Sequence, residues 1–140
     1  MGTATRAVTP VSMQLPFAPA AVSEARRALR SWRKDADVDD DFAYDARLII
    51  SELVGNAVRH AEPLPGDVLT VAWEINRRGL QISVTDGGTA DRVRSRPRRV
   101  PAAPTDTSGR GMAIVETLAA RWWTERGSTR TTVHAVVPID

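Results

Sequence analysis

The chain of 140 residues contains no cysteine and only one lysine, Lys34. Without cysteine it can form no disulfide bond and no thiolate metal site. No run of about 18 apolar residues is present, so we expect no transmembrane helix. The start of the chain lacks the apolar core of a secretory signal, and these absences favour a cytoplasmic protein. Arginine carries almost all of the positive charge. Because a GC-rich genome often produces such a bias, a local arginine cluster indicates little by itself.

What is present predicts one α+β domain. Apolar residues make up 42% and charged residues 26% of the chain, which is ordinary for a globular domain. We expect a flexible tail over residues 1–10 and a single folded domain over residues 11–140. Periodicity and turn residues predict strand, helix, helix, strand, strand, lid, helix, strand, strand. This order favours a two-layer α/β sandwich, with helices on one face of a mostly antiparallel, mixed sheet. The predicted elements are Val11–Phe17, Ala20–Lys34, Asp40–Ala61, Val68–Asn76, Leu80–Thr85, a lid over 87–108, a helix from Gly109, Trp122–Arg126 and Arg130–Val137.

Glu52 and Asn56 form a polar pair, four residues apart on a strongly apolar helix. That spacing puts both side chains on one helix face. A charged group there costs free energy unless something satisfies it. An amide oxygen is a suitable ligand for Mg²⁺, and a carboxylate can take a proton from a nucleophile. The pair therefore predicts a polar site built around a metal and a phosphate. The alternative is a solvated edge of an amphipathic helix.

The tripeptide Asp86-Gly87-Gly88 ends the second predicted hairpin strand. Asp86 continues the apolar phase of that strand, so its side chain should point to the buried side, where a carboxylate needs a partner or a ligand. It could accept a hydrogen bond from an amino group such as that of adenine, and the glycines would let a flat ring approach. The alternative is a plain turn, since Asp-Gly is common in turns.

The run Gly109-Arg110-Gly111-Met112 opens a predicted helix. Backbone N–H groups at a helix N-terminus favour anions, so this run could hold a phosphate. The alternative is an ordinary helix start after a flexible loop.

Thr131 shares its phase with the apolar residues of the last strand and should face the helices. Its hydroxyl could reach a ligand or a bound water. The alternative is a residue chosen for its β-propensity.

The segment from Gly87 to Ser108 has no convincing periodicity, and connections of this length are usually functional lids or disordered. Five arginines lie between Arg92 and Arg99. They could cover a triphosphate, attract an acidic partner or touch nucleic acid. Nucleic acid is the weaker reading because no aromatic residues are interleaved. A solvated loop is the alternative.

Together and in this order, the motifs resemble the Bergerat-fold (GHKL) ATP-binding domain shared by histidine kinases, gyrase B, Hsp90 and MutL. Glu52 and Asn56 look like its N box, Asp86-Gly87-Gly88 like its first glycine box, and Gly109-Arg110-Gly111-Met112 like its second. The resemblance spans about Val11 to Val137. Because the chain is small, it is most similar to the anti-sigma-factor serine kinase branch of this family, the regulators of RsbW type.

The resemblance implies ATP and Mg²⁺ as cofactors. Asn56 would coordinate Mg²⁺, and Glu52 would be the general base that takes the proton from a serine of the protein substrate. Asp86 would bind the adenine amine, with Gly88 making room for the ring. Thr131 would contact the adenine through a water molecule. The phosphates would be bound by the second glycine box, Gly109, Arg110, Gly111 and Met112.

The implied function is a serine/threonine protein kinase that phosphorylates an anti-sigma-factor antagonist (STAS-type) and sequesters a sigma factor, often as a homodimer. Two residues depart from the family pattern. Ala90 replaces the last glycine of the first glycine box, and Arg130 stands where a glycine usually precedes the strand threonine. These departures motivate the alternative of a non-catalytic, nucleotide-gated protein-interaction module. We expect neither membrane nor nucleic acid as a partner.

Overall fold

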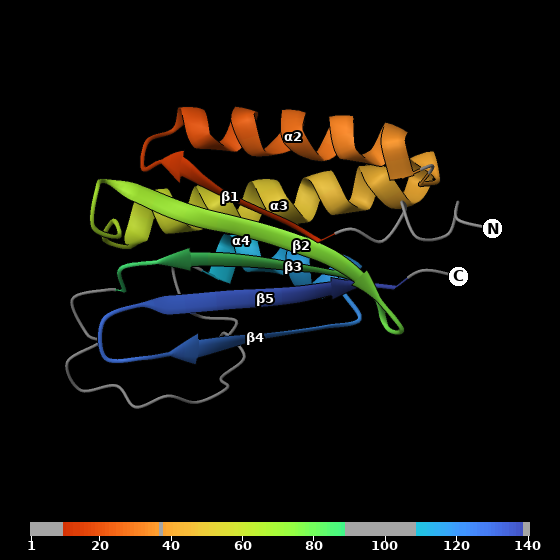
Figure 1. Cartoon of the computed structure of the whole chain (residues 1–140). Coiled ribbons are helices and arrows are strands. Elements are labelled where there is room, and N and C mark those ends of the chain that lie inside the picture. Colours follow the sequence, from red (N-terminus) through yellow and green to blue (C-terminus); the bar gives the residue numbers. More distant parts are fainter. Residues whose placement is uncertain (1–9, 37, 89–108, 139–140) are drawn as a thin grey trace.

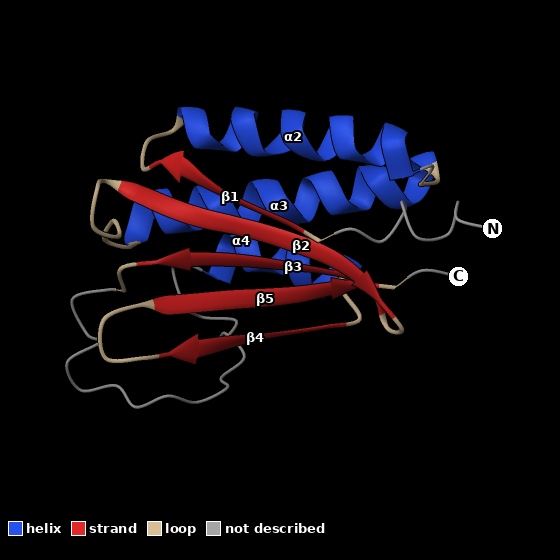
Figure 2. Ribbon diagram, in the orientation of Figure 1, coloured by secondary structure: helices blue, strands red, loops and turns tan. Residues whose placement is uncertain are grey.

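The computed structural model describes residues 10–36, 38–88 and 109–138, which form a helical layer on a β-sheet. Figures 1 and 2 show all three described helices on the same side of the sheet. None of these helices combines the length and the apolarity needed to cross a bilayer. The elements are β1 (Val11–Pro16), α2 (Ala20–Ala36), α3 (Asp40–His60), β2 (Val68–Asn76), β3 (Gly79–Asp86), α4 (Gly109–Leu118), β4 (Arg121–Arg126) and β5 (Thr131–Val137).

The sheet has the strand order β1-β2-β3-β5-β4, and every pairing is antiparallel. The described sheet is therefore purely antiparallel rather than mixed. β2 and β3 form a tight hairpin in which Asn76 pairs with Gly79. Gly79 has φ 139°, and a Cβ at this position would lie 2.1 Å from the carbonyl oxygen of Val137. Only glycine fits there, which explains the sharp turn at this point.

The apolar residues that alternate along the strands and those at helical spacing along α3 form one core between the two layers. The alternate residues of β2 and β3 that face the helices are buried, as their period of two predicts. α3 is the central helix, because it packs against α2, α4, β3 and β5. Its buried side consists mainly of Ile49, Ile50, Leu53 and Val54. This packing fixes the helix that carries Glu52 and Asn56.

The predicted helices and strands are all present in the described residues, with boundaries that agree or differ by at most two residues. α2, for example, ends at Ala36 rather than Lys34. The Arg92–Arg99 run, Ala90 and the predicted lid beyond Gly88 lie outside the described residues, as does the predicted tail apart from Pro10.

Candidate functional site

Asn56 connects the central helix to the first turns of α4. Its Nδ2 donates a hydrogen bond to the Sδ of Met112 at 3.3 Å. Its Oδ1 accepts from the guanidinium of Arg59 at 2.7 Å. The structure therefore brings together two motifs that lie 56 residues apart in the sequence. Both ends of the carboxamide are held by groups of the same chain.

Glu52 lies one turn before Asn56 on α3 and is partly buried. It makes no hydrogen bond or ion pair with any residue that the structure describes. Its acceptor capacity is therefore unused within this part of the chain. A carboxylate in that state can orient and deprotonate a hydroxyl group that is brought to it.

Asp86 lies at the end of β3 with only 5% of its surface exposed. Burial raises the pKa of its carboxyl from 3.8 to about 6, although a hydrogen bond from the backbone N–H of Gly88 opposes this shift. That N–H lies 2.7 Å from Oδ1. No other described residue donates to the carboxylate, so it keeps the capacity to accept from a ligand. Its burial agrees with the strand phase, while its role in binding adenine stays a prediction.

Thr131 is the register partner of Asp86, because the first residue of β5 pairs with the last residue of β3. It is also buried, with 9% of its surface exposed. The two polar side chains therefore stand on neighbouring strands, at one end of the sheet, on the face that the helices cover.

The two glycines after Asp86 attach this end of β3 to the segment that follows α3. The N–H of Gly87 donates to the carbonyl of Glu62 at 2.7 Å, and the N–H of Glu62 donates to the carbonyl of Gly88 at 2.8 Å. A Cβ on Gly87 would lie 2.3 Å from the carbonyl oxygen of Pro63. Gly88 has φ 92°. The fold itself therefore requires glycine here, which is a reason that the sequence did not reveal.

These contacts place the C-terminal end of α3 beside the end of β3. Glu62 follows Asn56 by six residues, so the Asn56–Met112 pair and the Asp86–Thr131 pair lie toward the same end of the molecule. α4 begins at Gly109, and its first N–H groups have no partners within the helix. The side chain of Arg110 lies outside the described part of the chain, so its predicted phosphate contact stays a prediction.

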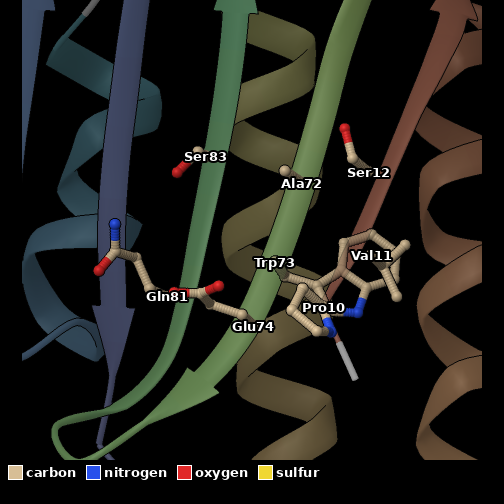
Figure 3. A pocket seen from close by; sticks show the side chains of 8 residues that line it. All are labelled: Pro10, Val11, Ser12, Ala72, Trp73, Glu74, Gln81 and Ser83. Carbon is tan, nitrogen blue, oxygen red and sulfur yellow. The ribbon is translucent and has the colours of Figure 1, made fainter. Parts of the chain in front are cut away.

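Two open hollows on the described surface are lined by none of Glu52, Asn56, Asp86, Met112 and Thr131, although Gly87 of the first glycine motif lines one of them. One, of about 580 Å³, is lined by residues 62–67, Gly87 and Thr129. The other, of about 380 Å³, lies over β1, β2 and β3, with Glu74, Gln81 and Ser83 among its lining residues (Figure 3). The candidate site is thus defined by converging side chains rather than by either of these hollows.

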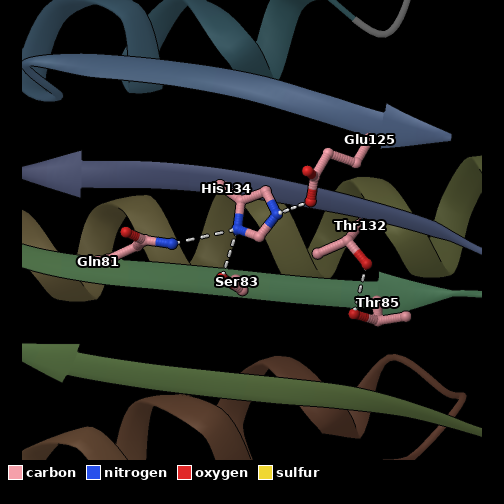
Figure 4. A network of polar contacts seen from close by, with 6 residues as sticks. All are labelled: Gln81, Ser83, Thr85, Glu125, Thr132 and His134. Atoms are coloured by element: carbon pink, nitrogen blue, oxygen red, sulfur yellow. Dashed lines mark hydrogen bonds and ion pairs between the residues drawn. The ribbon is translucent and has the colours of Figure 1, made fainter. Parts of the chain in front are cut away.

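A polar network crosses the sheet face that no described helix covers (Figure 4). His134 bridges strands through the hydroxyl of Ser83 at 2.7 Å and the carboxylate of Glu125 at 2.7 Å. Its ring also stacks on Trp123, with centroids 4.9 Å apart. The sequence analysis missed this network, and it also missed Arg59. Arg59 could have been found, because it follows Asn56 by three residues and so shares its helix face.

Comparisons with known proteins agree with this geometry. A family model described as the histidine kinase-like ATPase domain matches residues 15–137. The chain belongs to this family. The resemblance inferred from the three motifs is therefore confirmed, and most of this histidine kinase-like ATPase domain lies within the described residues.

Its relatives include the serine-protein kinase RsbW of Listeria innocua serovar 6a. The two are 28% identical over 116 residues, which cover 77% of this chain and 74% of the relative. The RsbW of Listeria monocytogenes serovar 1/2a is 28% identical over 118 residues. The fold is similar to a crystal structure of the RsbU and RsbW domains of a Mycobacterium tuberculosis protein, with a TM-score of 0.66 and 22% identity. That match covers 93% of this chain but only 32% of the solved one, and it supports the α+β fold alone.

Proposed function

We propose that this domain is an ATP- and Mg²⁺-dependent serine/threonine protein kinase of the anti-sigma-factor type. The observation that carries the proposal is Glu52, a partly buried carboxylate one turn from Asn56 with no partner among the described residues. A module that only binds nucleotide has no need of a free base at this place. The relatives named serine-protein kinase support the same reading.

On the nucleotide side, the buried carboxylate of Asp86 would accept from the exocyclic amine of adenine, with Thr131 beside it. The N–H groups at the start of α4 would bind phosphate oxygens. Because Met112 is bonded to Asn56, the phosphate end of the site would lie next to the metal ligand.

The residues present fit Mg²⁺ better than a metal held entirely by protein. Among the described residues, no three His, Cys, Asp or Glu side chains converge into a metal site. Asn56 would supply one oxygen, with phosphates and waters as the other ligands, which is the arrangement that Mg²⁺ prefers. When bound, Mg²⁺–ATP supplies the phosphoryl group and neutralises its charge. Glu52 would orient the serine hydroxyl of the substrate and accept its proton, and Arg59 would have to leave the oxygen of Asn56.

The protein partners follow from the same proposal. The substrate would be an anti-sigma-factor antagonist of STAS type, and a sigma factor would be the second partner, with the domain acting as a homodimer. The exposed Arg130 before Thr131 favours the second candidate, a nucleotide-gated interaction module without catalysis.

The deciding experiment compares the wild type with Glu52→Gln and Asn56→Ala. Calorimetry measures ATP–Mg²⁺ binding, and labelled ATP measures transfer to the antagonist. For Glu52→Gln we expect binding close to wild type and transfer reduced by about 10²–10⁴-fold, the usual contribution of a general base. For Asn56→Ala we expect weakened binding. Wild type that binds ATP but transfers no label to a folded antagonist would leave the interaction module as the function. Wild type that binds no ATP at millimolar concentration removes both readings.

A further inference from the structure

Helix α2 carries a row of four cations along its outward face. Arg26, Arg27, Arg30 and Lys34 are all exposed. The opposite face of the helix buries Ala21, Ala25 and Leu29 against the core. Arg30 follows Arg26 by four residues and Arg27 by three, and Lys34 follows Arg30 by four, so the four cations form one continuous strip.

The fold makes no use of this row. None of the four side chains forms an ion pair or hydrogen bond with a residue that the structure describes. Arg33 of the same helix is different, because it is only partly exposed and pairs with Asp40 of α3. Arg33 of α2 therefore has a partner, whereas the row has none among the residues that the structure describes.

The row also destabilises the helix on which it lies. Arg26 and Lys34 each lie four residues from Arg30, and Arg27 lies three residues from it. Like charges at these spacings destabilise a helix. Arg30 takes part in three such repulsive pairs, which lower the stability of α2. An anionic partner would relieve this repulsion.

The row is remote from the candidate nucleotide site. α2 packs against α3 and β1, whereas α4 packs against α3 and β4. Figure 1 shows α2 and α4 on opposite sides of α3. These cations therefore cannot be accounted for as ligands of the phosphates at the start of α4.

We propose that the row, Arg26, Arg27, Arg30 and Lys34, is a docking face for an acidic helix of a partner protein. It spans about 12 Å, because each helical residue rises about 1.5 Å. Carboxylates at every third or fourth residue of a partner helix have the same spacing. Among the other exposed residues of α2, Ala20, Ser23 and Ser31 are small and permit close approach, whereas the carboxylate of Asp35 lies at the C-terminal end, beyond the row. Nucleic acid fits less well, since the strip lies on a single convex helix and exposes no aromatic ring for base stacking.

The docking face rests on one part of the proposed function, namely that the domain is a regulator that binds a partner protein. It does not involve the nucleotide, so the two can fail separately. An ATP titration of the same protein samples shows which has failed, because absent ATP binding removes the kinase and leaves the docking face standing.

The test uses the full chain and a synthetic helical peptide with four glutamates along one face. The peptide with the same composition in scrambled order is the control ligand, and duplex DNA is the competing one. The double variant R26Q/R30Q removes two of the four cations, one helical turn apart. The matched control, R77Q/R78Q, removes two exposed arginines from the β2–β3 turn.

We expect fluorescence anisotropy to show binding of the patterned peptide that weakens at least tenfold in R26Q/R30Q and stays unchanged in R77Q/R78Q. The melting temperature of R26Q/R30Q should equal or exceed that of the wild type, since the repulsion is relieved. The proposal is overturned if the wild type does not bind the patterned peptide or binds the scrambled one equally well. It is also overturned if the double variant binds normally, or if duplex DNA binds more tightly than the peptide through the same arginines.

Discussion

The guanidinium of Arg59 donates a hydrogen bond to Oδ1 of Asn56 at 2.7 Å. The amide oxygen that we assign to Mg²⁺ is thus occupied by a cation from the next turn of the same helix. Metal and guanidinium cannot share this oxygen without strong repulsion. In the described structure, the chain itself therefore covers the oxygen of Asn56 that we propose as a metal ligand.

Replacing Arg59 with glutamine should make nucleotide binding depend more strongly on the metal. Without metal, the variant loses a cation near the phosphates, and with metal it no longer has a competitor at Asn56. Both effects raise the ratio of the ATP dissociation constant in EDTA to that in Mg²⁺. We expect a rise of about threefold to tenfold, since a charged hydrogen bond of this kind contributes on the order of 1 kcal/mol. Calorimetry measures the ratio. Arg59→Lys keeps the charge and should stay near wild type, and an unchanged ratio in Arg59→Gln would contradict the competition.

The buried carboxylate of Asp86 should make stability fall as pH rises from about 4 to about 6. Its pKa is raised from 3.8 to about 6 by burial. Between these values the folded state binds a proton that the unfolded state does not, so stability decreases with rising pH. Below 3.8 both states are protonated and the cost vanishes.

The variant D86N removes this cost while keeping an oxygen that can accept from Gly88. It should be more stable than wild type at pH 7.5, by up to roughly 3 kcal/mol, which is the free energy that corresponds to the raised pKa. The difference should disappear below pH 4. Urea unfolding across this range measures it, and a difference that does not vary with pH would speak against a desolvated carboxylate.

The same residue should have the opposite effect on nucleotide binding. An ionised carboxylate only accepts hydrogen bonds, whereas the protonated form presents a donor toward the adenine amine. ATP affinity should therefore fall as pH drops through about 6, the pKa of Asp86. D86N should bind ATP more weakly than wild type at pH 7.5 despite being more stable. If the asparagine variant bound ATP normally at every pH, Asp86 would not be the adenine ligand.

Gly87 should tolerate no side chain. A Cβ there would lie 2.3 Å from the carbonyl oxygen of Pro63, so Gly87→Ala forces the backbone at the end of β3 to shift. We expect a loss of about 1–3 kcal/mol or more in the free energy of unfolding. Gly55→Ala is the matched control. Its Cβ would meet only the flexible end of Arg59, at 3.0 Å, so we expect it to stabilise α3 by about 0.5–1 kcal/mol. Equal effects of the two changes would show that the contact with Pro63 can yield.

Local patterns predicted much of the fold because they depend on neighbours in the sequence. The period of two along Val68–Asn76 gave the limits of β2, and the same phase placed Asp86 on the buried side. Three motifs of a known family then predicted which residues would gather at one end of the sheet. The Asn56–Met112 contact agrees with that expectation.

Contacts between distant segments could not be predicted in this way. The clash that excludes a Cβ at Gly87 comes from Pro63, which lies beyond a whole hairpin in the sequence. The bridge from His134 to Ser83 and Glu125 depends on the register of three strands. No periodicity within one strand carries that information.

The strand order has a consequence for how the domain assembles. β5 follows β4 along the chain but lies between β3 and β4 in the sheet. A polypeptide interrupted before Thr131 therefore leaves β4 with no strand to join and Asp86 without its cross-strand neighbour. β4 is joined to the rest of the sheet only through β5. β5 thus both links β4 to the sheet and sets Thr131 beside Asp86, so a chain in which β5 has not yet paired with β3 should be unable to capture the nucleotide.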